Sequence, residues 1–194
     1  MIAFLQGNFV RKTPAMVLVE VNGMGYELHI SLNTYSSIVN KDQGKLHTYF
    51  HVREDAHLLY GFYEEEEKEM FMQLISVSGV GASTARMMLS SMKPSEIAKA
   101  ILQGNSKLLE NIKGIGKKSA ERIVLELRDK VGKNTAILNN EPLISNTLEQ
   151  DALNALIALG IARNTGEQAI AKVRKNQPDI QKIEDIIKQA LKNI

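Results

Sequence analysis

The sequence predicts a chain of several domains in which β-strands come first and α-helices follow. Residues 1–63 show the alternation of apolar and polar positions that is typical of strands. At Glu64 the pattern changes to the spacing of amphipathic helices. A polar stretch over 133–146 then separates two groups of helical segments. We therefore expect a multidomain fold, β and then α, within 194 residues.

Composition is typical of a soluble globular protein, with 44% hydrophobic and 24% charged residues. The absence of cysteine excludes disulfides, zinc–thiolate sites and thiol catalysis. No apolar run reaches the roughly 20 residues that a membrane span needs, and the first residues lack the basic start of a signal peptide. We expect a cytoplasmic protein that has no membrane partner.

The first domain, residues 1–63, is expected to be a small β-barrel or sandwich. The run MVLVEV at 16–21 alternates, NGMG follows as a turn, and YELHI at 26–30 alternates again, which predicts a hairpin. Two further apolar runs flank the sequence RED at 53–55 and predict a second hairpin. A five-stranded oligonucleotide-binding fold (OB-fold) is one barrel that fits this pattern.

The second domain, 64–132, is expected to consist of short helices joined by turns. Its first segment places Met70, Phe71 and Leu74 on one face, as the buried stripe of an amphipathic helix. Glu64–Glu67 begin this segment, where the helix dipole favours negative charge. We interpret these glutamates as a solvated helix start rather than as a metal site.

A polar segment, 133–146, is expected to be a flexible linker to a third domain, 147–194. In this tail Thr147 and Thr165 each stand three residues before a glutamine, which fits a capping box at a helix start. Gly160 suits the end of a helix. The core of so short a domain is marginal by itself, so we expect the tail to dock a partner.

Two short turns of glycine, an aliphatic residue and glycine recur 35 residues apart, each before a helix-forming run. The first turn is Gly79, Val80 and Gly81, and the second is Gly114, Ile115 and Gly116. The apolar residues around the turns also align, so the chain repeats a whole supersecondary unit. Glycine permits backbone angles that are closed to other residues. The helix that follows each turn begins with free N–H groups, which suit an anion.

The repeat lies in the basic part of the chain. Residues 70–133 contain 11 Lys and Arg against 5 Asp and Glu, whereas 1–63 contain 5 of each class and 134–194 contain 7 of each. Lys117 and Lys118 add positive charge directly after the second turn. A plain helix–helix turn would explain one isolated copy. Two copies in a basic segment favour binding to nucleic-acid phosphates, independent of base sequence and sensitive to salt.

Other phosphate-binding and catalytic motifs are absent from the sequence. Gly116 is followed by two lysines and no buried strand precedes it, which excludes a P-loop. Thr84 and Ser119 stand where a dinucleotide-binding turn needs a third glycine. The histidines lie in the strand region, without the spacing of a metal site on a helix. We expect no cofactor, no metal and no ATP hydrolysis by this chain.

The repeat resembles a tandem helix-hairpin-helix module, a unit that binds DNA backbones. With a barrel before it and a tethered helical tail after it, the whole chain resembles the RuvA family, the Holliday-junction-recognition subunits of a bacterial branch-migration complex. The stretches REDAHLLYGF at 53–62, GVG at 79–81 and GIGKKSAER at 114–122 are similar to the most recognisable parts of that family.

The resemblance implies an N-terminal OB-fold barrel, a central tandem helix-hairpin-helix domain and a C-terminal three-helix domain similar to UBA domains. It implies a homotetramer, alone or paired as an octamer, that binds a four-way DNA junction independently of sequence and holds it open and square-planar. The tail would bind the hexameric ATPase RuvB, and the resolvase RuvC would be a further partner. The family acts in homologous recombination, DNA repair and the SOS response to DNA damage, as a non-catalytic subunit.

The resemblance also implies roles for particular residues. Glu54 and Asp55 match an acidic pin at the junction centre, although their spacing alone would indicate a polar hairpin tip. Leu156, Leu159 and Ile161 are our candidates for motor binding, with core packing favoured for each taken singly. The positions that match DNA-backbone contacts are Gly79, Val80, Gly81, Arg86, Gly114, Ile115, Gly116, Lys117, Lys118 and Arg122.

The first turn departs from the family at one point. Ala82 and Ser83 follow it, where members of the family often have a lysine. We therefore expect the first turn to hold DNA through its backbone N–H groups and Arg86.

The sequence alone leaves two rival functions open. A DNA glycosylase also uses a helix-hairpin-helix with a reactive lysine, but AILNN at 136–140 holds no acid where such enzymes place an aspartate after the position of Lys118. Base release from lesion DNA would favour a glycosylase. A protein-binding scaffold would use the glycine turns for structure alone. DNA affinity that survives replacement of Lys117 and Lys118 by Glu would favour the scaffold.

Overall fold

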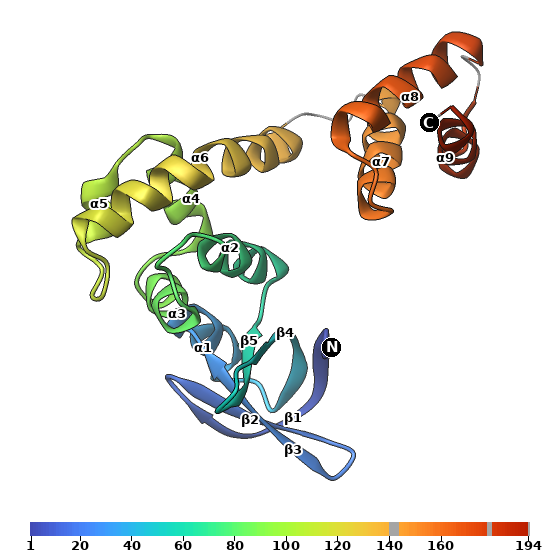
Figure 1. The fold of residues 1–194 in the computed structure, drawn as a ribbon. Coiled ribbons are helices and arrows are strands. Elements are labelled where there is room, and N and C mark those ends of the chain that lie inside the picture. Colours follow the sequence, from blue (N-terminus) through green and yellow to red (C-terminus); the bar gives the residue numbers. More distant parts are fainter. Residues whose placement is uncertain (140–143, 178–179, 194) are drawn as a thin grey trace. The chain divides into compact units, whose positions relative to one another are not determined.

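The computed structural model describes residues 1–139, 144–177 and 180–193 (Figure 1). The chain divides into two compact units, Met1–Thr135 and Ala136–Ile194. The first unit holds a β-barrel and a helical module, and the second holds the helices of the tail. This order of strands before helices confirms the predicted fold class.

Five strands close the barrel in the order β1-β2-β3-β5-β4. Neighbouring strands are antiparallel except β3 and β5, which run parallel. Val17, Val19 and Leu28 are fully buried in the barrel core, because alternate residues of a strand face the same side. The closed sheet confirms the barrel and excludes the sandwich. The strands are β1 (Phe4–Thr13), β2 (Met16–Val21), β3 (Met24–Ile30), β4 (Gln43–Val52) and β5 (His57–Phe62).

Both predicted hairpins are present. Asn22 and Gly23 form the turn between β2 and β3 with positive φ angles of 50° and 82°, as a primed two-residue turn requires. The tip between β4 and β5 is closed by a hydrogen bond from the Arg53 N–H to the Ala56 carbonyl (2.9 Å). The RED sequence therefore forms the tip of the second hairpin.

A helix that no sequence pattern predicted, α1 (Leu32–Ile38), connects β3 to β4. The Ser31 hydroxyl caps its start by accepting the Thr34 N–H at 3.0 Å. The helix has only 7 residues, too few for a clear amphipathic repeat. A serine directly before a short run without Gly or Pro is its weak signal in the sequence.

The helical module packs directly on the barrel. Met70, Phe71 and Leu74 are buried, as predicted. The Phe71 ring centroid lies 5.2 Å from that of Tyr60 and 4.9 Å from that of Phe62, so the helices share a core with β5. The helices are α2 (Glu65–Ile75), α3 (Ala82–Ser91), α4 (Pro94–Leu102), α5 (Ser106–Glu110) and α6 (Lys117–Asn139).

One of the four glutamates at the start of α2 is not solvated, which corrects the prediction. The first three are exposed, but Glu67 is only 3% exposed. Ser31 and Thr34 donate hydroxyl hydrogen bonds to its carboxylate. The helix turns Glu67 toward the barrel, where these hydroxyls replace water. Among the described residues no group of His, Asp and Glu is arranged to hold a metal ion.

The range 133–146, expected to be a linker, contains helical backbone at both ends. The helix α6 continues to Asn139 and α7 begins at Ile144, while residues 140–143 lie outside the described part of the chain. No Gly or Pro occurs between Gly132 and Asn139, so nothing in the sequence stops α6 earlier. The domain bounds and the linker role stay predictions.

The described residues of the tail form three helices, α7 (Ile144–Ala158), α8 (Arg163–Asn176) and α9 (Ile183–Lys192). Leu153, Ile170 and Ile186 lie in their shared core. This confirms the expected three-helix domain. In the part of the chain that the structure describes, no helix has the length and apolar character of a membrane span.

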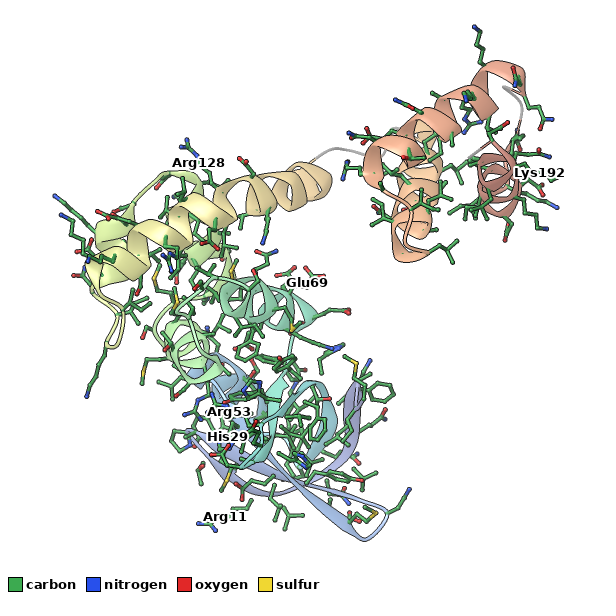
Figure 2. All side chains as sticks on the ribbon, viewed as in Figure 1. Arg11, His29, Arg53, Glu69, Arg128 and Lys192 are labelled. Carbon is green, nitrogen blue, oxygen red and sulfur yellow. The ribbon has the colours of Figure 1, made fainter. Side chains whose placement is uncertain are left out.

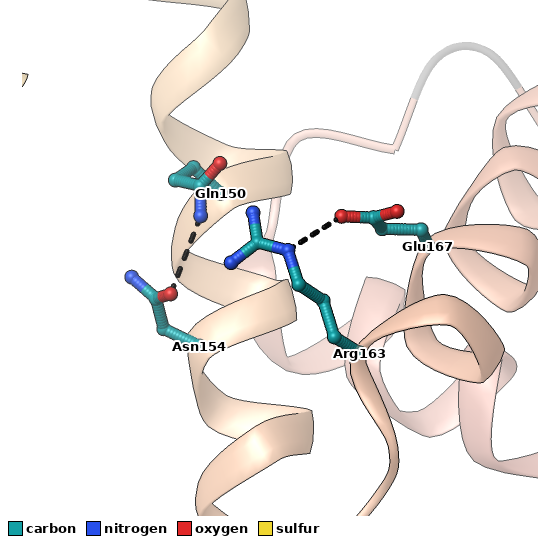
Figure 3. Close-up of polar contacts among 4 residues, drawn as sticks. All are labelled: Gln150, Asn154, Arg163 and Glu167. Atoms are coloured by element: carbon teal, nitrogen blue, oxygen red, sulfur yellow. Dashed lines mark hydrogen bonds and ion pairs between the residues drawn. The ribbon is translucent and has the colours of Figure 1, made fainter. Parts of the chain in front are cut away.

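Helix ends in the tail match the sequence predictions only in part. Gly160 has a φ of +89° just after α7, as predicted for a helix end. The two capping boxes are wrong, because Thr147 and Thr165 lie inside α7 and α8. Figure 3 shows that Gln150 instead donates to Asn154 one turn later (3.3 Å), and that Arg163 pairs with Glu167 in the same spacing (2.8 Å).

Candidate nucleic-acid interface

The two glycine turns have the same geometry. Gly79 and Gly114 have φ angles of +88° and +93°, which favour glycine because a Cβ would be strained there. The aliphatic residue in each turn is buried, with 5% of Val80 and 6% of Ile115 exposed. In each turn this residue donates its N–H to the carbonyl three residues before it, at 3.0 Å. The structure therefore confirms that the sequence repeat is a structural repeat.

Each turn leads into a helix whose first amide groups have no acceptor within the helix. The first helical bond of α3 runs from the Ala85 N–H to Gly81 (2.9 Å), and that of α6 runs from the Ala120 N–H to Gly116 (3.0 Å). The amides that come before these donors lie at the positive end of the helix dipole. The two helix starts can therefore each bind an anion.

The second glycine of each turn is not required by the fold. Gly81 has ordinary extended angles, φ −84° and ψ 165°, and Gly116 is not in the positive-φ region. A Cβ added at either position would meet no atom of the chain within 4 Å. The chain therefore leaves room beside both glycines, where the backbone of a ligand can approach closely.

The predicted basic residues differ in their surroundings. Lys117 and Lys118 are exposed in the first turn of α6. Arg122 donates from Nη1 to the Ser78 carbonyl at 3.2 Å, and so connects α6 to the start of the first glycine turn. Its Nε also lies 3.8 Å from the Glu126 carboxylate. This residue, which was predicted to bind DNA, therefore links the helix after the second turn to the residue just before the first turn.

Arg86 also contacts the protein itself. Its Nη1 donates to the carbonyl of Ala15, in the turn between β1 and β2, at 3.1 Å. A guanidinium has five N–H donors in a fixed fork, so this contact orients the group and leaves other donors for a ligand. No pattern in the sequence indicates this contact, because Ala15 is 71 residues away.

The predicted pin residues lie at the tip of the second hairpin. Glu54 and Asp55 are both exposed, between β4 and β5. The neighbouring Arg53 donates from Nε to His51 Nε2 at 2.9 Å. Figure 2 labels Arg53 and His29, which both lie on the barrel. The structure therefore brings the acidic pair together on an exposed tip of the barrel.

His29 is a half-buried residue of the barrel wall. Its ring centroid lies 5.6 Å from that of Tyr60. Burial lowers the pKa of His29 and the positive charge of Arg86 lowers it further, while Glu27 raises it. The imidazole is therefore neutral near pH 7 and contributes aromatic packing rather than charge.

The three residues predicted for motor binding are not equivalent. Leu156 is fully buried in the core of the tail, so its side chain presents no surface to a partner. Leu159 is 63% exposed and Ile161 is half-buried at the edge of that core. Ile157 and Leu191 are also exposed, at 39% and 43%, although neither was among the predicted candidates.

Comparison with protein-family models gives three matches. Residues 1–61 match the RuvA N terminal domain, 71–129 match the SAM-like helix-hairpin-helix tandem, and 147–194 match the RuvA C-terminal domain.

Similar proteins match over the whole chain. Proteins from Christiangramia forsetii and Flavobacterium psychrophilum are 44% and 45% identical over all of both chains. One from Syntrophotalea carbinolica is 46% identical over 99% of this chain and 98% of its own. Each relative is named Holliday junction branch migration complex subunit RuvA.

Proposed function

Because the chain belongs to the RuvA family, we propose that it is the non-catalytic subunit that recognises four-way DNA junctions for branch migration. It binds the junction as a homotetramer, independently of base sequence, and holds the four arms open in a plane. It recruits the hexameric ATPase RuvB, which supplies the energy for strand movement in recombination and repair. This activity belongs in the cytoplasm, where bacterial DNA lies.

The pair of helix starts behind the glycine turns is the observation that carries this proposal. Two helix starts with the same turn geometry, on segments that the bond from Arg122 to Ser78 links, suit two phosphates of a DNA backbone. Lys117 and Lys118 add charge at the second site. Contacts to phosphates position the protein on DNA without reading the bases.

The acidic tip supplies the second part of the mechanism. In a tetramer, four copies of Glu54 and Asp55 meet near the axis, where their negative charge repels the phosphates of the crossing strands. Repulsion at the centre and attraction at the arms together favour an open junction. One tetramer leaves one face of the junction free for RuvC, whereas two tetramers cover both faces.

The tail supplies the contact with the motor. Leu159 and Ile161, together with the exposed Ile157, provide an apolar surface at the end of α7. Deletion of the tail leaves the barrel and the glycine turns intact. The proposed division of labour therefore puts DNA binding in 64–132 and motor binding in 147–194.

Substitution of single glycines tests the two helix starts. Gly81→Ala and Gly116→Ala add a methyl group in open space, so both variants fold, but the methyl blocks close approach of a phosphate and weakens DNA binding. Gly79→Ala measures the separate effect of backbone strain in the same turn, since its positive φ makes it lose about 1–2 kcal/mol of stability. Junction affinity of Gly81→Ala and Gly116→Ala equal to that of the wild type would contradict phosphate binding at the helix starts.

A further inference from the structure

The buried carboxylate of Glu67 lies where the barrel joins the helical module. It is in the first turn of α2, three residues after the N-cap residue Glu64. Thr34 Oγ1 donates to one of its oxygens at 2.6 Å, and Ser31 Oγ donates to the other. Both hydroxyls belong to α1 or its cap, on the barrel side. The carboxylate thus ties the start of α2 to α1.

The hydrogen bonds around Glu67 form a closed set. Ser31 Oγ accepts the Thr34 N–H (3.0 Å), and Thr34 Oγ1 accepts the Tyr63 N–H (3.0 Å). Each hydroxyl therefore receives one backbone donor and gives its own proton to the carboxylate. An amide in place of the carboxylate offers only one oxygen, so one hydroxyl proton loses its acceptor.

The opposite side of α1 is bound to the end of α3. Asn33 Nδ2 donates to the carbonyls of Leu89 (2.6 Å) and Met92 (3.0 Å), and so caps the C-terminal end of that helix. The Leu32 N–H donates to Ser90 Oγ at 3.1 Å. The short helix α1 therefore holds both α2 and α3, the two helices that flank the first glycine turn.

We infer that α1, Asn33 and Glu67 form a bracket that fixes the glycine turns relative to the acidic tip, and that these residues select junctions over duplex DNA without contacting DNA. This inference rests on the proposed function. A duplex needs only the glycine turns of one chain. A junction needs the helical modules of four chains to bind four arms around one centre. A module that is displaced from its position therefore reduces the binding of all four arms at once.

Burial around the bracket is consistent with this role. Burial raises the pKa of Glu67, the hydrogen bonds from Ser31 and Thr34 lower it, and the nearby Glu64 raises it. A buried carboxylate with hydroxyl partners on another module costs stability unless both oxygens are hydrogen-bonded. Displacement of α1 from α2 would therefore leave a buried carboxylate oxygen without its hydroxyl donor.

The test compares two bracket variants with two matched controls. Glu67→Gln and Asn33→Ala break the two sides of the bracket separately. Glu65→Gln removes an exposed charge from the same helical turn, and Thr34→Ser keeps the hydroxyl that Glu67 requires. We expect the bracket variants to bind linear duplex like the wild type. The ratio of their junction affinity to their duplex affinity should fall about tenfold. The controls keep that preference.

The distance between the barrel and the helical module can be measured in the absence of DNA. The chain has no cysteine, so spin labels can be placed through Asp42→Cys on the barrel and Lys107→Cys on α5, both exposed sites. Labelled chains diluted with unlabelled chains report the distance within one chain. We expect one narrow distance in the wild type and in Glu65→Gln, and a broadened or shifted distance in Glu67→Gln and Asn33→Ala.

The outcomes separate the bracket from the proposed function. Folded bracket variants that keep the narrow distance or the full junction preference would overturn the bracket. An equal loss of duplex and junction affinity would also overturn the bracket, since Asn33 and Glu67 would then affect the glycine turns themselves rather than their position. A wild-type chain without junction preference would contradict the proposed function, and the distance would still decide whether the bracket exists.

Discussion

Arg122 of α6 donates a hydrogen bond to the carbonyl of Ser78, 44 residues earlier in the chain. This bond links α6, six residues after Gly116, to the residue that precedes the first glycine turn. A single helix start binds one anion weakly, whereas two on one rigid module can bind two phosphates at once. We therefore predict that DNA binding depends on the pair of helix starts rather than on either alone.

Charge reversal at the second turn should weaken binding to all DNA. Lys117→Glu with Lys118→Glu removes positive charge beside the helix start, so we expect affinity for junction and duplex to fall by about tenfold or more. The slope of log affinity against log salt concentration should become shallower by about one for each phosphate that the variant no longer binds. Titrations at several salt concentrations measure both. Lys188→Glu with Lys192→Glu, on α9, changes net charge equally and should leave both quantities unchanged.

Neutral amides at the tip should not weaken junction binding. Glu54→Gln with Asp55→Asn removes the charge that repels phosphates at the centre, so we expect affinity to stay equal or rise. The rate of RuvB-driven branch migration should change, because strands are no longer kept apart. A large fall in junction affinity would show that these carboxylates attract rather than repel the bound structure.

Two leucines of the tail should behave differently. Leu156→Ala creates a cavity in the tail core and should cost about 2–5 kcal/mol of its stability. Leu159→Ala is at an exposed site and should change stability by less than about 0.5 kcal/mol, while it lowers stimulation of the RuvB ATPase. Thermal unfolding and ATPase assays separate the two effects.

Removal of residues 147–194 extends this comparison. The truncated chain should bind junctions normally and should not stimulate the motor. Full stimulation by the truncated chain would refute the assignment of motor binding to the tail.

Stability should depend on pH through His29. Its pKa in the folded chain is below the ordinary value of 6.5, because burial and Arg86 disfavour the charged imidazole. The unfolded chain therefore takes up this proton more readily, and the wild type should lose stability relative to His29→Gln as pH falls below 6.5. Urea unfolding of both proteins from pH 8 to pH 5 measures the difference. A constant difference across this range would show that His29 titrates like a free histidine.

Local pattern predicted the parts of the fold that depend on neighbouring residues. Alternation identified the inward face of β2 and β3, and the Asn-Gly pair identified the turn between them. The repeat of the glycine turns predicted two equal helix starts. These features depend on the backbone conformation of a few consecutive residues, so the residue types at those positions predict them directly.

Features that depend on distant contacts could not be read from the pattern. The burial of Glu67 follows from hydroxyls more than 30 residues earlier, and the contact of Arg86 with Ala15 joins two modules. The capping boxes failed because Gln150 bonds within its own helix and α8 starts directly after the Gly160 turn. In each case tertiary packing, rather than local propensity, decided the outcome.

Competitive binding tests junction recognition most directly. A four-way junction and a linear duplex of equal length compete for the wild-type chain over a series of salt concentrations. We predict a strong preference for the junction together with a steep fall of affinity with salt, because phosphates on four arms are contacted at once. Equal affinity for the two DNAs would contradict junction recognition. Binding to neither DNA would indicate that the glycine turns only connect helices.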